Sequence, residues 1–266
     1  MVGLAERGRC VLGLYRLLID VDRASFLSIV FYGLALPVGL LWWASSYEDA
    51  TRIRSILGAA VLSALFIALR RGGQTVAIEK LTGAWRLLEG TRVTRGTYLA
   101  AHALDTFLLA MVPVLLLPPA TVLLLGLEPG SLLWLLPYGL AVVSFGAFGF
   151  LIGGVCRSLP VAGLATNLSL ILALTLCPLL YPRENVPDVL RAFVLAAPPT
   201  LAVDAMTSAW EHGLLPRPQL AGLAAWAVGA TVALVRWFPW TDRDQPQSAG
   251  FTSRRRSASP RPSPAD

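Results

Sequence analysis

The polar residues that could carry chemistry are few and lie within or between apolar segments. His102 and Asp105 are three residues apart, so a helix would place both on one face, where they could either relay a proton or bond to a neighbouring helix. Glu79 and Glu89 are isolated carboxylates, whereas a membrane enzyme that acts on lipid headgroups would need acidic or histidine residues clustered at one face. The only lysine, Lys80, follows a glutamate and not a glycine, so no phosphate-binding loop is recognisable. The sequence therefore predicts no catalytic, cofactor-binding or metal-binding residues.

The composition indicates an all-α integral membrane protein with no room for a soluble catalytic domain. Hydrophobic residues make up 55% of the 266 residues and charged residues only 14%, with a mean hydropathy of +0.63. Soluble domains carry about 25% charged residues. Cys10, Cys156 and Cys177 lack the spacing of a redox motif or a metal site, so we interpret them as small apolar residues. No removable signal peptide and no nucleic-acid-binding module is recognisable.

Six hydrophobic runs are long enough to cross a bilayer, which takes about 20 residues. They cover residues 26–44, 54–71, 98–126, 131–156, 159–181 and 219–238. If the N-terminus is inside, the inner segments hold 17 of the 22 Lys and Arg residues and the outer segments hold 5. Cytoplasmic segments retain positive charge, so we expect both termini in the cytoplasm.

The two ends of the chain have patterns of their own. Residues 1–24 place apolar and charged residues on opposite sides of a helical wheel, which is typical of a helix lying at the membrane interface. Residues 239–266 are rich in Pro, Ser and Arg and predict a disordered basic tail. Arg254, Arg255 and Arg256 either touch anionic lipid headgroups or stay solvated.

Prolines mark the third span and the segment before the sixth span. The prolines of the third span are Pro113, Pro118 and Pro119, and they should kink or break that helix near its outer end. After the fifth span, Pro187 can open a short helix that runs to Ala196, where a proline pair stops it. Thr200 can cap a second short helix that contains Asp204 and Trp210. Both helices are too short and too polar to cross the membrane.

Small and polar residues in the fourth and fifth spans indicate close contacts between helices. The spacing of Gly149 and Gly153 lets helices approach closely, either within the chain or at a dimer seam. Thr166, Asn167 and Ser169 cluster in the fifth span, where they either line a pathway or bond to a neighbouring helix.

The longest charged segment between two spans covers residues 79–98. Its first half predicts an amphipathic helix with an apolar stripe beside a polar one. The apolar stripe is Ile78, Leu81, Trp85 and Leu88, and the polar stripe is Glu79, Thr82, Arg86 and Glu89. Gly90 ends this helix, and charged residues follow as far as Arg95. Taken alone, this is the pattern of a solvated loop between membrane helices.

Part of this segment resembles the loop between the second and third spans of type-2 ABC exporter permeases, in which the pattern runs roughly R-G-T-x-E-x-L-x-x-T-P-V-S-R. The matching residues are Gly83, Leu87, Leu88, Thr91, Val93 and Arg95. Arg92 stands where the family usually has proline, and Trp85 stands near a position where an acidic residue is common. The two short helices before the sixth span resemble the re-entrant outer helices of the same family. The resemblance covers residues 10–238.

The resemblance implies six transmembrane helices with an amphipathic elbow helix over residues 1–24 and a permease domain over residues 25–238. It implies a cytoplasmic coupling helix between spans two and three and re-entrant helices between spans five and six. The residues that would contact a separate ABC ATP-binding subunit are Trp85, Arg86, Glu89, Thr91, Arg92 and Arg95. ATP and Mg would bind to that subunit, so no cofactor is expected in this chain. We expect Glu89 and Arg95 to transmit force and to contribute little to the stability of the fold.

The function implied is outward transport by alternating access in a bacterial inner membrane. The chain would work as a homodimer or as a pair with a related permease. Its substrate would be an amphiphilic drug, a natural product or a lipid-like molecule. Export of a glycolipid or polysaccharide is an alternative, as is a membrane-embedded lipid-modifying enzyme or a scaffold that transports nothing. An apolar pathway recognises its substrate by shape, so the sequence does not identify the substrate.

Overall fold

The computed structural model describes residue 39 and residues 49–85, 93–126, 130–181 and 186–239. Its helices are α3 (Asp49–Ala68), η1 (Leu69–Thr75), α4 (Val76–Leu81), α6 (Arg95–Leu125), η2 (Leu132–Trp134), α7 (Leu135–Val155), α8 (Leu159–Leu176), α9 (Asp188–Ala196), α10 (Pro198–His212) and α11 (Arg217–Trp237). No β-strand occurs in these ranges. The predicted elbow helix, the first span and residues 240–266 of the tail lie outside the described residues.

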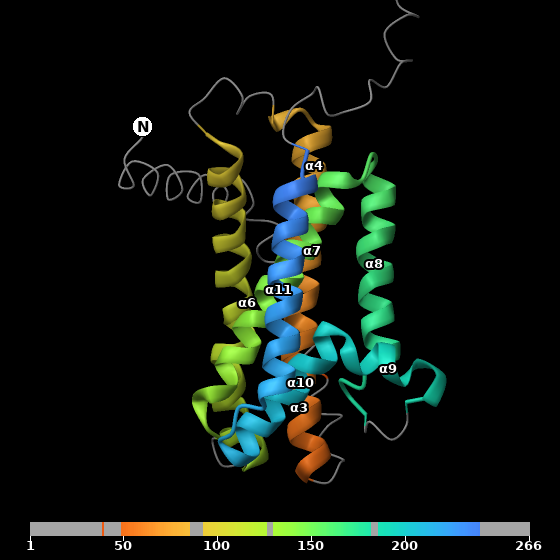
Figure 1. Cartoon of the computed structure of the whole chain (residues 1–266). Helices are drawn as coiled ribbons and strands as arrows, with labels where there is room; N and C mark the ends of the chain where they lie inside the picture. Colours follow the sequence, from red (N-terminus) through yellow and green to blue (C-terminus); the bar gives the residue numbers. More distant parts are fainter. Residues whose placement is uncertain (1–38, 40–48, 86–92, 127–129, 182–185, 240–266) are drawn as a thin grey trace, which may run out of the picture.

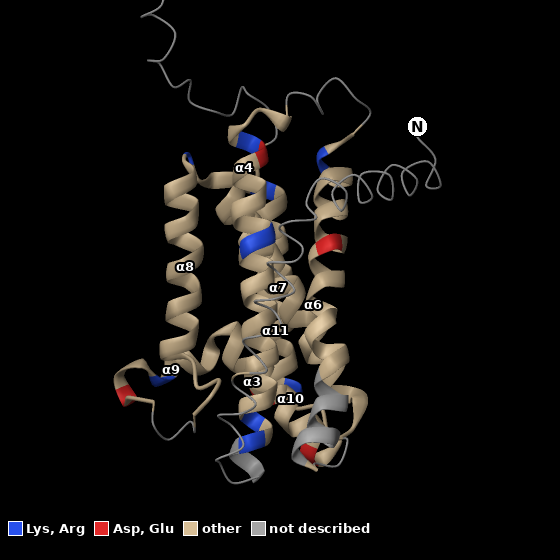
Figure 2. Cartoon of the chain, turned by 180° about the vertical axis from the view of Figure 1, so that it is seen from behind, with Lys and Arg blue, Asp and Glu red and all other residues tan. Residues whose placement is uncertain are grey.

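The long helices α3, α6, α7, α8 and α11 run lengthwise in one bundle (Figure 1). α4 lies at one end of the bundle, together with the start of α6 and the ends of α7 and α11. The short helices α9 and α10 lie at the opposite end (Figure 1). We call these the α4 end and the α10 end. Charged residues gather toward the two ends and long uncharged stretches separate them (Figure 2).

Five helices within the described ranges are long and apolar enough to cross a membrane. They are Arg52–Leu81, Arg95–Leu116, Leu132–Val155, Leu159–Leu176 and Arg217–Trp237. The helices α9 and α10 would count as a sixth if the two, which are bent by 74°, formed one broken span. Five of the six predicted spans are therefore present as helices.

The predicted end of the second span is wrong. The helix that begins with α3 continues through the π-helical segment η1 and through α4 to Leu81, whereas the sequence predicted an end at residue 71. Hydropathy assigned Arg71, Glu79 and Lys80 to a solvated loop. In the structure each of these charges has a partner within the bundle, and Arg71 is buried, whereas Glu79 and Lys80 are partly exposed.

The centre of the bundle is α3, which packs on α6, α7, α8 and α10. Residues 55–65 are all buried. Farther along this helix, η1 lies against α7 with almost no side chain between the backbones. A Cβ atom on Gly149 would collide with the carbonyl oxygen of Ala68, and one on Gly153 would collide with that of Gly72. The two glycines therefore have a packing role within the chain.

The prolines of the third span do not interrupt α6, which continues through all three of them to Leu125. Of the two predicted outcomes, a break is therefore wrong, and a kink stays a prediction. A proline removes one helical hydrogen bond, and in a membrane protein neighbouring helices can hold such a turn in place. The hydroxyl of Tyr138 on α7 donates to the carbonyl of Ala110 at 2.5 Å, in the turn before Pro113.

The two short helices after the fifth span are present as α9 and α10. The first has the predicted limits, but α10 begins at Pro198 and not after a Thr200 cap. The N–H groups of the first helical turn have no partner within the helix, so proline, which lacks an N–H, suits this position. The proline pair therefore forms the start of α10 and is not a separate linker between α9 and α10. Gly213, with φ of 62°, ends it. Insertion of α9 and α10 into the membrane stays a prediction.

Candidate functional site

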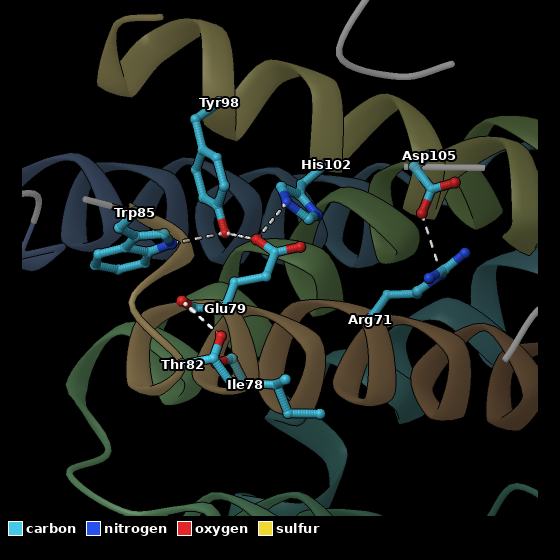
Figure 3. A network of polar contacts seen from close by, with 8 residues as sticks. All are labelled: Arg71, Ile78, Glu79, Thr82, Trp85, Tyr98, His102 and Asp105. Carbon is cyan, nitrogen blue, oxygen red and sulfur yellow. Dashed lines mark hydrogen bonds and ion pairs between the residues drawn. The ribbon is translucent and has the colours of Figure 1, made fainter. Parts of the chain in front are cut away.

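The side chain of Glu79 joins α4 to α6 at the α4 end (Figure 3). Its Oε2 accepts a hydrogen bond from the Tyr98 hydroxyl at 2.5 Å and lies 3.1 Å from His102 Nε2. Tyr98 and His102 are four residues apart on α6, so they share a helix face, and both are almost completely buried. The interpretation of Glu79 as an isolated carboxylate is therefore wrong.

An ion pair lies farther into the bundle along the same two helices. Arg71 Nε on η1 is 3.1 Å from Asp105 Oδ2 on α6, and the two side chains are 4% and 5% exposed (Figure 3). Asp105 follows His102 by three residues, so both face the helix that contains Glu79. His102 and Asp105 each contact a partner on that helix. Of the two roles considered for this pair, a proton relay or a bond to a neighbouring helix, the structure shows the second. Removing one member of a buried pair typically costs about 3–5 kcal/mol, so this contact fixes how η1 packs on α6.

Trp85 lies inside the protein and not on its surface. Its Nε1 donates to the Tyr98 hydroxyl at 3.2 Å, and its ring centroid lies 5.3 Å from that of Phe238. Trp85 is only 5% exposed. Trp85 is thus not on the surface in the conformation described, and its contact with an ATP-binding subunit stays a prediction. Trp85 anchors the start of the segment that leads to α6.

A tight turn directs Trp85 into this position. The Thr82 hydroxyl donates to the carbonyl of Ile78 at 2.8 Å, and Gly83 has φ of +83°, which L-residues with a side chain rarely adopt. α4 therefore ends at Leu81, and the predicted continuous helix from Glu79 to Gly90 is wrong. Ile78 and Leu81, expected on one stripe with Trp85, are exposed, whereas Trp85 is buried.

Arg95, at the start of α6, binds the end of α11. Its guanidinium donates to the carbonyl of Leu234 at 2.8 Å and to that of Val235. The Leu234 carbonyl also accepts from the Phe238 N–H, and the negative end of the helix dipole attracts positive charge, so Arg95 stabilises this helix end. The expectation that Arg95 contributes little to the fold is therefore wrong. Its contact with an ATP-binding subunit stays a prediction.

Lys80 makes the equivalent contact with α7. Its Nζ donates to the carbonyl of Gly154 at 2.5 Å and to that of Cys156 at 3.1 Å, where α7 ends. The segment between α4 and α6, residues 82–94, is therefore fastened on both sides to buried groups and to helix ends. The remaining predicted coupling residues, Arg86, Glu89, Thr91 and Arg92, lie outside the described residues.

The polar residues predicted in the fifth span do not share one face of α8. Thr166 is buried and accepts a hydrogen bond from Gln74 Nε2 on η1 at 3.0 Å. Ser169 donates to the carbonyl of Ala165 in its own helix, and Asn167 is exposed. Thr166 thus bonds to a neighbouring helix, and a role of these residues in a pathway stays a prediction.

A second ion pair, largely buried, lies at the α10 end and was not predicted. Arg54 NH1 on α3 lies 2.9 Å from Asp204 Oδ1 on α10, and the same guanidinium donates to the carbonyl of Pro178 at 2.8 Å. Arg54 is the first residue of the predicted second span, and Asp204 lies in the second of the predicted short helices. Residues so far apart in the chain cannot be paired by spacing alone.

These contacts fasten helices together and provide no visible reaction centre. Within residues 49–85, 93–126, 130–181 and 186–239, no group of three or more His, Cys, Asp or Glu could hold a metal ion. At the α4 end, Glu79 binds Tyr98 and His102, and Lys80 and Arg95 bind backbone carbonyls.

Comparison with known protein families shows which family the chain belongs to. A family model described as ABC-2 type transporter matches residues 21–210. The chain belongs to this family. This ABC-2 protein is accordingly a transporter membrane component and a multi-pass membrane protein, and proteins of this family work with ATP-binding subunits. The match includes the Glu79 network and α10 as far as Trp210, but α11 lies beyond it. A search of curated proteins found no match to the chain.

Proposed function

We propose that this ABC-2 protein is the permease subunit of an exporter that moves an amphiphilic drug, a natural product or a lipid-like molecule outward. It would act as a homodimer, or as a pair with a related permease, bound to two ATP-hydrolysing subunits. Closure of those subunits on ATP would move the segment 82–94, and the spans would rearrange by alternating access. The chain itself has no recognisable phosphate-binding loop, so ATP and Mg belong to the partner.

The observation that carries the proposal is the attachment of the segment 82–94 at both of its ends. Glu79 and Trp85 meet Tyr98 at one buried position, and Arg95 holds the end of α11. A segment attached to buried groups passes a displacement on to the helices that contain those groups. A long solvated loop would absorb the same displacement by changing its own conformation.

The charge distribution supports a cytoplasmic position for the α4 end. Lys80, Arg95, Arg157 and Arg236 all lie at the ends of helices that meet there. Lys and Arg are retained on the cytoplasmic side of membrane proteins, so the segment 82–94 would face an ATP-binding subunit in the cytoplasm. We place the protein in the bacterial inner membrane with both termini inside.

The apolar surfaces of the long helices support an amphiphilic substrate. Leu164 on α8 and Val232 on α11 are 68% and 58% exposed, and charged residues are scarce along the middle of the bundle. A substrate that reaches the protein from the lipid would meet surfaces of this kind. A strongly ionic substrate would find few groups to compensate for its loss of hydration.

Copurification in mild detergent tests the proposal. We expect an ATP-binding protein to copurify with the chain and its ATPase activity to rise when amphiphilic dyes are added, whereas the chain alone should show no saturable ATP binding. Stimulation only by glycolipids or oligosaccharides would assign the alternative substrate class. Saturable ATP binding by the chain alone, or the absence of any ATP-binding partner, would contradict the proposal.

A further inference from the structure

We propose that α11 carries the movement of the segment 82–94 to α9 and α10 at the opposite end of the bundle, and that Phe238 is the positioning residue through which it does so. This inference rests on the proposed function, because the movement would originate in an ATP-hydrolysing partner. It adds a route through the last span, which the coupling residues predicted from the sequence do not include.

Phe238 lies where both ends of the segment 82–94 meet α11. Its ring centroid is 5.3 Å from that of Trp85 and 6.3 Å from that of Tyr98, and the Arg95 guanidinium carbon lies 5.6 Å from it. Phe238 is 3% exposed. A Cβ atom on Gly154 would approach the Phe238 ring to 2.7 Å, so the glycine at the end of α7 leaves the space that the ring occupies.

This cluster is the principal contact between α11 and the helices on either side of the segment. Among the described residues, α11 packs along α7 and α10, and neither α4 nor α6 packs along α11. The direct contacts of α11 with α4 and α6 are therefore concentrated around Phe238 and Arg95, with Leu234 and Ala230 in the same cluster. Aromatic packing and two hydrogen bonds to helix-end carbonyls make that contact resistant to sliding.

The opposite part of α11 contacts α9 and α10. Trp226 Nε1 donates to the carbonyl of Ala196, the last residue of α9, at 2.9 Å. A Cβ atom on Gly222 would approach the side chain of Leu201 on α10 to 2.9 Å. α11 is a single helix of 21 residues without a break, so a shift at Phe238 displaces Trp226 as well. α11 thus connects the α4 end, through Phe238, with α9 and α10, through Trp226 and Gly222.

A fluorescent reporter on α9 tests this route. The chain is prepared without its three cysteines, and a cysteine at Val189, which is 94% exposed, is labelled with an environment-sensitive dye. The labelled chain and its copurified ATP-binding partner are placed in lipid nanodiscs. The change in emission is recorded when ATP, Mg²⁺ and vanadate trap the nucleotide-bound state. In the wild type we expect a reproducible change.

The decisive comparison is between two neighbouring aromatic residues. Phe238→Ala should reduce the emission change about fivefold or more while the partner still binds and traps nucleotide. Trp237→Ala should leave the change close to that of the wild type, because Trp237 is 64% exposed and absent from the cluster. Phe238→Tyr keeps the ring and should retain most of the change.

Three results would overturn the inference. The first is a normal emission change in Phe238→Ala, and the second is an equal loss in Trp237→Ala. The third is loss of partner binding in Phe238→Ala, which would mean that the ring only shapes the docking surface. If Phe238→Ala does not fold, Trp226→Phe, which keeps an aromatic ring but removes the indole N–H that donates to Ala196, must reduce the emission change for the inference to stand. A wild-type chain that binds no ATP-binding protein would instead refute the proposed function itself.

Discussion

The ion pair between Arg71 and Asp105 leads to the sharpest prediction about stability. Both side chains are at least 95% buried, and their charged atoms are 3.1 Å apart. Arg71→Met leaves the Asp105 carboxylate buried without this partner, and Asp105→Leu does the same to Arg71. Each single variant should therefore lower the free energy of unfolding by about 3–5 kcal/mol. The double variant leaves two apolar side chains in contact and should recover most of that loss.

The exposed ion pair between Asp188 and Arg191 on α9 provides the matched control. Its atoms are 3.4 Å apart, but the two side chains are 92% and 50% exposed. Water and salt screen such a pair, so Asp188→Asn should change stability by no more than about 0.5 kcal/mol. Loss of one partner is thus predicted to cost about six times as much or more in the buried pair as in the exposed pair.

Unfolding by a denaturing detergent, followed by tryptophan fluorescence, measures these differences in the purified chain. The wild type and the three variants of the Arg71 and Asp105 cycle give a coupling energy, which we expect to exceed about 4 kcal/mol, because each single variant loses about 3–5 kcal/mol and the double variant recovers most of that loss. A coupling energy near zero would mean that the two charges do not interact in the membrane. A loss in Arg71→Met no larger than that in Asp188→Asn would refute the conclusion that this pair allows the second span to extend to Leu81.

Three further predictions use the same logic. Tyr98→Phe removes the hydroxyl that donates to Glu79 and accepts from Trp85, so it should cost about 1–3 kcal/mol in the same unfolding assay, and a neutral effect would count against the Glu79 network. Gly153→Ala places a methyl group against the carbonyl of Gly72 and should cost about 1–3 kcal/mol, whereas Gly139→Ala on the same helix meets open space and should be neutral or stabilising. For topology, a cysteine at Glu211 should react with a membrane-impermeant thiol reagent in intact cells and one at Thr91 should not; labelling of position 91 from outside would reverse the orientation.

The positions of the spans were predictable because a long apolar run is a local property of the sequence. The limits of α9 were predictable for a similar reason, since Pro187 and the following proline pair restrict the backbone wherever they occur. The family was predictable from the segment around Thr91, and the family model confirms it. The start of α10 was predicted wrongly, because the proline pair was interpreted only as the end of α9. Proline also suits the first turn of a helix, and α10 begins at Pro198.

The candidate site was not predictable, because its contacts join residues far apart in the chain. Glu79 meets Tyr98 across 19 positions, and Arg95 meets Leu234 across 139. A single sequence does not show which charged residues will be paired. A prediction from hydropathy therefore assumes that every charged residue is solvated. For this reason the predicted second span ended before the helix does. Gly83 was a local signal for the end of α4, but the apolar periodicity from Ile78 to Leu88 outweighed it in the sequence interpretation.

The later end of the second span changes the physical character of the connection to the third. A loop from Arg70 to Arg95 would be long enough to move without disturbing either span. The structure reduces the connection to residues 82–94, and it attaches Trp85 and Arg95 to α6 and α11. A displacement of Trp85 or Arg95 must therefore disturb the buried contacts that these residues make with Tyr98 and with the end of α11. Substitutions at Arg95 should consequently alter the stability of α11 as well as any contact with a partner.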